Sequence, residues 1–275
     1  MRDCMLPAVP AIALAMPSSA HLAALLIQAY KTRQPLDARP ESGPLSAEQA
    51  YAVQREVWQR MAGQVRPVAW KAGAPNRQTE PTSAAVFPQC VAHSTTNKPV
   101  QFFADDFRTL GIEAEIALCF GRDLPARVEP YRREEILDAI ASAHVAMELV
   151  DTRLANADAA GPLWRLADSL LNGGLVIGEA IPNWRDLDFS GLSVRVEANG
   201  CRLAETIGRP PLDDLFYCLP WWINHIGGAK AGDIVTTGAW NGMHPVGLPA
   251  EVSVEFVGVD SAVGKISALV GKTEI

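Results

Sequence analysis

The chain has 275 residues, of which 48% are hydrophobic and 20% charged, and its formal charge is −7 at pH 7. This composition is typical of a soluble globular protein that buries a large core, and the acidic balance, without a basic cluster, argues against nucleic acid as a partner. Five cysteines without a C-x-x-C pair indicate reduced thiols in a cytoplasmic protein, rather than a disulfide framework or a zinc site.

The N-terminal stretch, residues 1–20, resembles a signal peptide only faintly. Asp3 offsets the charge of Arg2, and prolines interrupt the apolar residues, so we expect a disordered or overlong N-terminus, with secretion as the lesser alternative. No apolar run in the chain is long enough to cross a bilayer, and a membrane is therefore not an expected partner.

Two helices are expected next. Apolar residues recur at helical spacing over residues 19–33, and a capping box at Ser46–Gln49 begins a second helix that Gly63 ends. We therefore predict two regions: an N-terminal extension and helical region at residues 1–66, and a β-rich domain at residues 67–275.

A short buried strand is predicted at residues 68–73, with Lys71 near its end. An ammonium group is costly to bury without a partner. The simpler interpretation is a lysine whose stem carries its ammonium out to solvent, and a lysine held for a functional site is the alternative. Residues 81–93 are expected to be irregular and able to cover such a site.

The strand predicted at residues 111–120 carries the most informative pattern in the chain. Its even-numbered positions are all apolar, whereas Glu113 and Glu115 fall on the other face. Their Cα atoms would lie roughly 6.6 Å apart at about 3.3 Å per residue, close enough for both carboxylates to reach one hard cation. By itself, however, this pattern is more typical of a half-exposed strand with two solvated glutamates.

A further strand is predicted at residues 144–151, after a helix at residues 132–141. Glu148 shares a face with Ala146 and Val150, so it is not patterned for solvent, although a glutamate on an edge strand is an equal alternative. Three carboxylates on two strands would suit Mg²⁺ or Mn²⁺ held for a substrate, because no histidine or cysteine cluster favours a softer metal.

The remaining elements mix strands and short helices. Asn199–Gly200 predicts a type I′ hairpin, and Pro220 is expected to kink an amphipathic helix at residues 211–226. Helices that precede strands, with hairpins dominating over βαβ units, indicate an α+β fold with a mostly antiparallel or mixed sheet system. The other predicted elements are a helix at 162–171 and strands at 175–177, 192–198, 201–204, 233–237, 251–257 and 265–270.

Six segments in order resemble the fumarylacetoacetate hydrolase family over about residues 45–270, and most strongly its 2-keto-4-pentenoate hydratase branch. These segments are Trp70–Pro75, Gly111–Ala117, Gly121–Pro125, Glu148–Arg153, Leu166–Asp168 and Gly232–Gly238. The resemblance implies a mixed β-sandwich or β-roll of the family's C-terminal-domain type, with an N-terminal helical region, so that residues 67–275 would form the catalytic domain.

The resemblance also implies roles for single residues. It assigns Glu113, Glu115 and Glu148 as ligands of Mg²⁺ or Mn²⁺, Lys71 as a catalytic residue near the substrate, and Asp168 and Thr237 as substrate-binding residues. A glutamate as the third ligand, in place of aspartate, resembles the hydratase and decarboxylase branch. Since the family tends to form homo-oligomers, a homo-oligomer is expected.

These likenesses imply a metal-dependent hydro-lyase that hydrates a 2-hydroxydienoate or 2-oxo-alkenoate, as in the meta-cleavage catabolism of aromatic compounds. The substrate would be a small 2-oxo acid, and Lys71 would assist by its charge, or by proton transfer if burial lowers its pKa. The alternatives are a decarboxylase of 2-oxo diacids (4-oxalocrotonate type) and a catalytically silent paralogue that binds metal or 2-oxo acids. Departures from the family's pattern at residues 169–171 and Ala239 motivate the silent alternative.

Overall fold

The computed structural model describes residues 17–94, 99–207, 209–258 and 262–271. The prediction of a disordered or overlong N-terminus concerns residues 1–20, of which residues 1–16 lie outside the described residues. In the described part of the chain, no helix is both long and apolar enough to cross a membrane. The helices are α1 (Ser19–Thr32), α2 (Ala47–Ala62), α3 (Arg133–Ala139), α4 (Ala157–Ala160), α5 (Pro162–Ala167) and α6 (Leu219–His225). The strands are β1 (Ala69–Gly73), β2 (Thr82–Val86), β3 (Val91–His93), β4 (Val100–Phe103), β5 (Gly111–Phe120), β6 (Leu124–Pro125), β7 (Ile140–Val150), β8 (Asn172–Ala180), β9 (Ser193–Ala198), β10 (Cys201–Ile207), β11 (Gly228–Ala229), β12 (Ile234–Thr236), β13 (Met243–Pro245), β14 (Ala250–Val257) and β15 (Ala262–Gly271).

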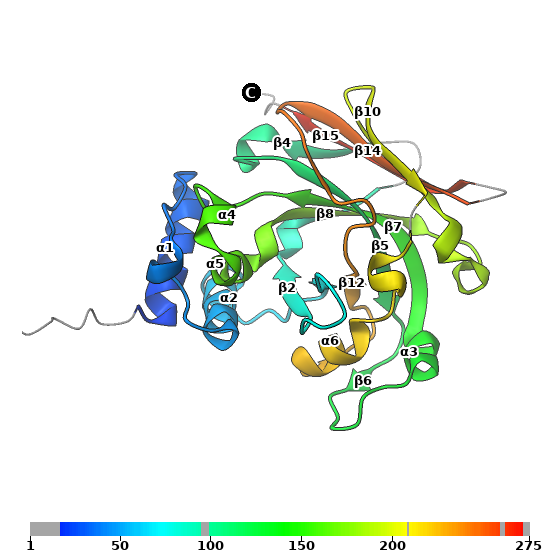
Figure 1. Ribbon diagram of the computed structural model, residues 1–275, viewed down its shortest axis with the longest axis horizontal. Coiled ribbons are helices and arrows are strands. Elements are labelled where there is room, and N and C mark those ends of the chain that lie inside the picture. Colours follow the sequence, from blue (N-terminus) through cyan, green and yellow to red (C-terminus); the bar gives the residue numbers. More distant parts are fainter. Residues whose placement is uncertain (1–16, 95–98, 208, 259–261, 272–275) are drawn as a thin grey trace, which may run out of the picture.

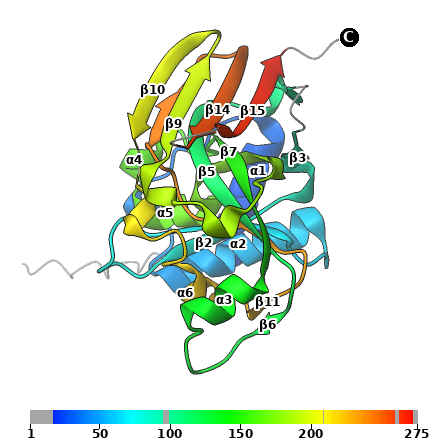
Figure 2. The same cartoon turned by 90° about the vertical axis from the view of Figure 1, so that its right-hand side faces the viewer.

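Two large sheets form the body of the molecule (Figure 1). The larger runs in the order β2-β1-β12-β5-β7-β8-β3, with β13 also paired to β5, and the smaller runs in the order β10-β9-β14-β15-β4. Pairing is mixed, because β1–β12, β3–β8 and β15–β4 are parallel and the central pair β5–β7 is antiparallel. Figure 2 shows the smaller sheet on one side of the long strands β5 and β7, with α3 and α6 on the other side. The structure confirms the predicted α+β fold with mixed, curled sheets and N-terminal helices.

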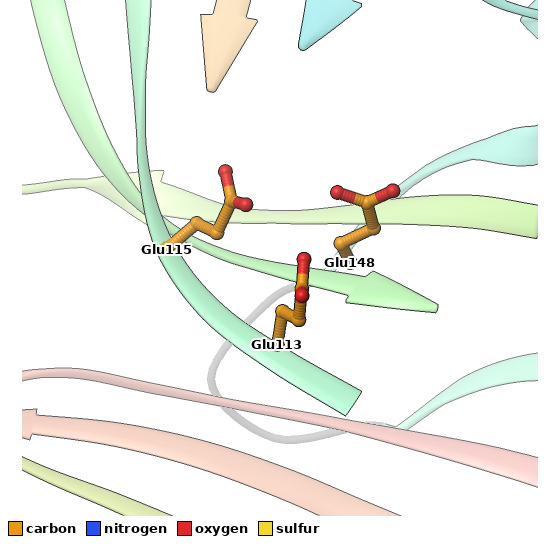
Figure 3. A group of neighbouring side chains, drawn as sticks. All are labelled: Glu113, Glu115 and Glu148. Carbon is orange, nitrogen blue, oxygen red and sulfur yellow. The ribbon is translucent and has the colours of Figure 1, made fainter. Parts of the chain in front are cut away.

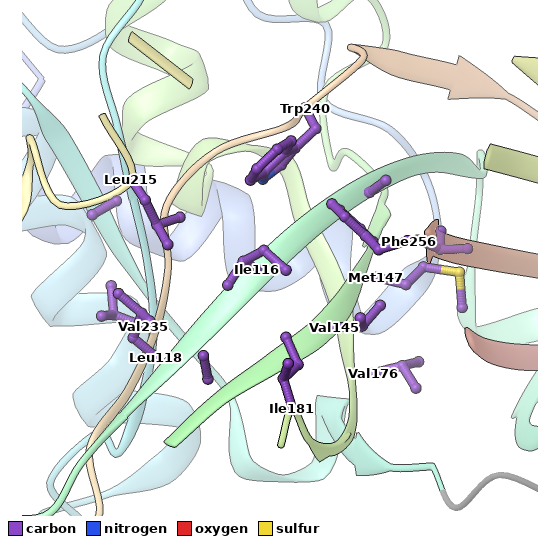
Figure 4. Close-up of a cluster of buried hydrophobic side chains, with 14 of the residues drawn as sticks. Ile116, Leu118, Val145, Met147, Val176, Ile181, Leu215, Val235, Trp240 and Phe256 are labelled. Atoms are coloured by element: carbon purple, nitrogen blue, oxygen red, sulfur yellow. The ribbon is translucent and has the colours of Figure 1, made fainter. Parts of the chain in front are cut away.

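The apolar face of β5 packs against the smaller sheet, as its alternation predicts. All five even-numbered residues of β5 are buried in the main core, together with Val254 and Phe256 of β14. Figure 4 shows Ile116, Leu118 and Phe256 in this core. Burying one such aliphatic or aromatic side chain contributes about 1.5–3 kcal/mol. This core therefore fixes which face of β5 points inward and, by the two-residue period, leaves Glu113 and Glu115 on the opposite face.

The N-terminal helices share a separate core with the middle of the chain. Leu22 and Leu26 of α1 and Val53 of α2 lie in one buried cluster with Trp164 and Leu166 of α5. Ser46 is the N-cap of α2, as predicted, since it accepts a hydrogen bond from the Gln49 amide, and Gly63 follows the last turn. The reciprocal bond of a capping box is displaced by one residue, because the Gln49 side chain accepts from the Leu45 amide at 2.8 Å. The proposed boundary between residues 66 and 67 stays a prediction.

Several predicted elements differ from the observed ones. The segment at 81–93, expected to be irregular, contains β2 and β3, which extend the larger sheet at its two edges. Of the helix expected over 211–226, only α6 (Leu219–His225) forms an α-helix. Pro220 lies in the first turn of α6, where its missing amide hydrogen costs nothing, so it begins the helix and does not kink it. The helix expected at 132–141 ends at Ala139, because Ile140 already begins β7.

The helix expected at 162–171 ends early for a different reason. After Ala167 the chain makes one left-handed turn, η4 (Ser169–Leu171), in which the φ angles are 51°, 54° and 63°. A left-handed conformation costs roughly 1–2 kcal/mol for each residue with a side chain. The apolar spacing that predicted a longer right-handed helix carries no sign of this reversal. The hairpin at Asn199–Gly200 is confirmed, since both residues have positive φ.

Candidate metal centre

Three glutamates converge where β5 and β7 pair. The antiparallel register places Glu113 directly opposite Glu148, and Glu115 lies two residues further along the same face. One carboxylate oxygen from each of the three lies within 4.8 Å of the others. Figure 3 shows the side chains pointing from neighbouring strands into one space. Glu115 is 1% exposed, so the solvated-glutamate interpretation does not hold for it. Glu148 is 0% exposed and lies on β7, between β5 and β8, so the edge-strand alternative is wrong.

Lys71 reaches the same space from β1. Its Nζ lies 2.5 Å from Glu148 Oε1 and donates a second hydrogen bond, of 3.1 Å, to the Leu170 carbonyl. Only 14% of the lysine side chain is exposed, so it does not reach out to solvent. The structure thus brings together the four residues that the sequence analysis assigned to metal binding and catalysis.

The charges in this space perturb one another strongly. Burial and the neighbouring charges of Glu148 and Glu113 together raise the pKa of Glu115 to about 8. Burial and the charge of Glu148 also raise the pKa of Glu113, to about 6. Both shifts express the cost of holding several negative charges close together away from water.

The Lys71 pKa moves in the direction opposite to the one considered from the sequence. Burial alone would lower it, but the charges of Glu148, Glu113 and Glu115 outweigh burial and hold the pKa above its ordinary value. In this structure Lys71 is therefore a cation, not a neutral amine. Its positive charge offsets part of the negative charge of the three glutamates.

The oxygen donors fit a hard divalent cation. Glu148 Oε2 is buried and has no hydrogen-bond partner among the described residues, although Oε1 accepts bonds from Lys71 and from Asn172 Nδ2. A buried carboxylate oxygen without a partner is costly, and a cation would satisfy it. The three carboxylates can carry more negative charge than the single positive charge of Lys71 balances. Their oxygen atoms are the ligands that Mg²⁺, Ca²⁺ and Mn²⁺ prefer.

Asp168 and Thr237 are engaged with other protein groups. The Asp168 carboxylate accepts bonds from Arg153 Nε at 2.5 Å and from the Thr152 hydroxyl at 2.8 Å, and the residue is only 3% exposed. The Thr237 hydroxyl faces the Ile116 carbonyl at 3.5 Å. The substrate-binding role that the resemblance assigns to these two residues stays a prediction.

A family model described as "Fumarylacetoacetate (FAA) hydrolase C-terminal" matches residues 54–266. The chain belongs to the fumarylacetoacetate hydrolase family. The members of this family include decarboxylases, isomerases and hydrolases, so the family is enzymatic. No curated protein matches the sequence.

Solved structures share the fold of this family member. A 4-oxalocrotonate decarboxylase from Pseudomonas putida G7, complexed with magnesium and adipate, superimposes with a TM-score of 0.76 at 19% identity, over 92% of this chain and 97% of that one. The same decarboxylase complexed with calcium and acetate gives a TM-score of 0.75 at 18% identity, over 94% and 98%. A 2-hydroxyhepta-2,4-diene-1,7-dioate isomerase from Mycobacterium marinum gives a TM-score of 0.53 at 16% identity, over 75% of both chains.

Two residues beside the glutamates were not found from the sequence. Asn172 donates to Glu148 at 3.0 Å, but its position before two glycines predicted only the end of a helix. Leu170 contributes its backbone carbonyl to Lys71, and a carbonyl is common to all residue types. No pattern in the side chains of this family member signals a backbone contact of that kind.

Proposed function

We propose that this protein is a divalent-metal-dependent hydratase of 2-hydroxydienoates or 2-oxo-alkenoates, of the 2-keto-4-pentenoate hydratase type. The observation that carries the proposal is the convergence of Glu113, Glu115 and Glu148 with the Lys71 ammonium in one largely buried space. Such a constellation suits a substrate that presents two oxygens to a metal and develops negative charge beside a cation.

Glu113, Glu115 and Glu148 would hold Mg²⁺ or Mn²⁺. When bound, the cation supplies Lewis-acid chemistry, which stabilises the negative charge that an enol or enolate of a 2-oxo acid carries on oxygen. Asn172 and Lys71 both bond Glu148 Oε1 and so leave Oε2 for the cation. Bonds of this kind orient a ligand and tune its basicity.

Lys71 would act on the substrate. Its ammonium can donate a hydrogen bond or a proton to an anionic substrate oxygen. Because Glu148 and Leu170 already hold the ammonium in place, little reorganisation of the site would be needed during the reaction. The apolar residues beside the glutamates, Ala117, Ala146 and Leu175, exclude water from this end of the sheet. Low local polarity strengthens every charge interaction there.

Decarboxylation of a 2-oxo diacid is the second candidate. It uses the same enolate and therefore the same four residues. The observation that favours it is the superposition on 4-oxalocrotonate decarboxylase, which extends over 92% of this chain, whereas the isomerase superposition extends over 75%. A silent paralogue that only binds metal or 2-oxo acid is the third candidate, and Ser169–Leu171 and Ala239 motivate it.

The test is product analysis with purified, Mn²⁺-loaded protein. On 2-hydroxypenta-2,4-dienoate, we expect water addition to give 4-hydroxy-2-oxopentanoate. On 4-oxalocrotonate, release of CO₂ would instead identify the decarboxylase. Turnover of neither substrate, with Mn²⁺ bound, would leave the silent paralogue.

Glu148→Ala tests the metal centre itself. We expect it to abolish measurable Mn²⁺ binding and metal-dependent turnover while the protein stays folded, because Glu148 contributes a ligand more than packing. Glu179→Ala, an exposed glutamate on β8, is the control and should bind Mn²⁺ as the wild type does. Unchanged Mn²⁺ affinity in Glu148→Ala would exclude Glu148 as a ligand.

A further inference from the structure

The left-handed turn η4 delivers two polar groups to the glutamate cluster. The Leu170 carbonyl, in the middle of the turn, accepts a hydrogen bond from Lys71 Nζ at 3.1 Å. The side chain of Asn172, the next residue after the turn, donates to Glu148 Oε1 at 3.0 Å. Because a carboxylate only accepts, the amide nitrogen must face Glu148. Both contacts depend on a backbone conformation that residues with side chains disfavour.

Arg153 binds both ends of this turn. Its Nη2 donates to the Asp168 carbonyl and its Nη1 to the Asn172 carbonyl, each at 2.7 Å. Its Nε donates to the Asp168 carboxylate, which also accepts from the Arg153 amide at 3.0 Å. One planar guanidinium thus holds three acceptors on the residues that flank η4, an arrangement that a lysine cannot reproduce.

We propose that Arg153 is a positioning residue that holds η4 in its left-handed form and thereby places Leu170 against Lys71 and Asn172 against Glu148. The inference rests on the proposed metal centre, since its effect is exerted through Glu148 and Lys71. Arg153 and Asp168 are both buried, and the turn lies between their two anchor points. On this proposal Asp168 acts through Arg153 and not by touching substrate.

Three backbone hydrogen bonds also hold the turn. The Leu171 amide donates to the Asp168 carbonyl, the Asn172 amide donates to the Ser169 carbonyl, and the Leu171 carbonyl accepts from the Asp151 amide. These bonds close the turn upon itself and upon the end of β7, but none of them joins Asp168 to Asn172. Only the Arg153 side chain, among the contacts described here, joins the backbone before the turn to the backbone after it.

The experiment compares Arg153→Lys with Arg66→Lys. Arg66 also pairs with a buried aspartate, Asp233, but at the other end of β12, so its loss should destabilise the fold without touching η4. In metal-free Arg153→Lys protein we expect faster amide hydrogen exchange in peptides covering residues 169–172. We also expect the Kd for Mn²⁺, measured by electron paramagnetic resonance, to rise by about 10- to 100-fold, the usual effect of losing a partner of a metal ligand. Arg66→Lys should change neither quantity.

Asn172→Ala keeps the test decisive if Arg153→Lys fails to fold. It removes the bond to Glu148 and leaves the backbone carbonyl that Arg153 holds, so Mn²⁺ affinity should fall while exchange at 169–172 stays as in the wild type. Wild-type exchange rates in Arg153→Lys would overturn the role of Arg153 in holding the turn. Wild-type Mn²⁺ affinity in both variants would overturn the role of the turn in the site. Failure of the wild type to bind Mn²⁺ would instead overturn the proposed metal centre, and the exchange measurement would still decide whether Arg153 holds η4.

Discussion

Lys71 shows how the surroundings of one residue decide its protonation. A lysine at the end of an apolar strand suggests a group whose pKa burial has lowered, yet the carboxylates around Lys71 keep it charged. A charged lysine is suited to electrostatic stabilisation of an anion and to donation of a proton, and unsuited to acting as a base. This distinction bears directly on how a dienol would be converted to its ketone.

Lys71→Met should separate catalysis from metal binding. Methionine keeps most of the apolar stem, so we expect turnover to fall by roughly 10²-fold or more, the usual loss for one acid–base or electrostatic group. Mn²⁺ affinity should change little, because the loss of a bond to the ligand Glu148 and the loss of a cation that repels the metal act in opposite directions. Lys230→Met, which removes an exposed ion pair with Asp123, is the control. Near wild-type turnover in Lys71→Met would remove Lys71 from the site.

Lys71→Arg then distinguishes the two roles of the ammonium. Arginine keeps the charge but cannot release a proton in the accessible pH range. An active variant would indicate electrostatic stabilisation, and an inactive variant with intact Mn²⁺ binding would be compatible with proton transfer. Steady-state kinetics beside a Mn²⁺ titration of the same preparation is the measurement.

The raised pKa values of Glu113 and Glu115 predict how metal-free protein responds to pH. Each folded pKa, about 6 and about 8, lies above the ordinary value of 4.5, so between these values the folded chain holds more protons than the unfolded one. Stability should therefore fall as pH rises from about 4.5 to about 8. Metal binding should tighten over the same window, because the cation replaces the protons.

Thermal midpoints measured across this pH range, with and without Mn²⁺, check that prediction. Glu115→Gln is the control, since it has no proton to lose and should flatten the slope at the upper end of the window. A metal-free midpoint that rises between pH 6 and 8 would contradict the stated signs.

At the scale of elements, the register of β5 and β7 builds the cluster. A shift of one residue would place Glu148 opposite an apolar position of β5 and turn it into the main core, so the core residues of both strands enforce the register. Strand β8 supports β7 from its other side and begins at Asn172. At Gly173, the second residue of β8, the backbone lies so close to its neighbours that no Cβ fits without a shift.

Gly173→Ala tests that close approach. A Cβ at residue 173 would lie 2.7 Å from the Asp151 Cβ and 2.9 Å from the Leu149 carbonyl oxygen, so backbone must shift. We expect a loss of about 1–3 kcal/mol from overpacking, which lowers the thermal midpoint by several degrees at about 2–4 °C per kcal/mol. Gly247→Ala, where no heavy atom lies within 4 Å of the added Cβ, should leave the midpoint unchanged. Equal midpoints in both variants would refute the steric argument.

At the scale of the whole molecule, α1 and α2 are bound to the β-rich part through a shared core. Removing residues 1–66 would expose Leu154, Trp164 and Leu166, which are buried against the two helices. We therefore expect a chain of residues 67–275 to bind a hydrophobic dye and to lose cooperative thermal unfolding. A chain that begins at residue 17 is the control. Cooperative unfolding of the shorter chain at the wild-type midpoint would show that the helical region is dispensable.

The sequence by itself determined the features that depend on local periodicity. Alternation along residues 111–120 is enough to place Glu113 and Glu115 on one face, because side chains of a strand point alternately to its two sides. The N-cap at Ser46 and the Asn199–Gly200 hairpin were predicted for the same reason, since each is a short-range preference of the backbone.

Only the tertiary structure decided how distant segments meet. Glu148 reaches Glu113 through strand pairing, and Lys71 reaches Glu148 across a curled sheet, contacts that no periodicity encodes. The left-handed turn at Ser169–Leu171 reads as helix in the sequence, because the apolar spacing of a segment does not reveal the sign of φ. That sign is decided by Arg153, whose bonds to both ends of the turn form only once β7 and β8 lie side by side.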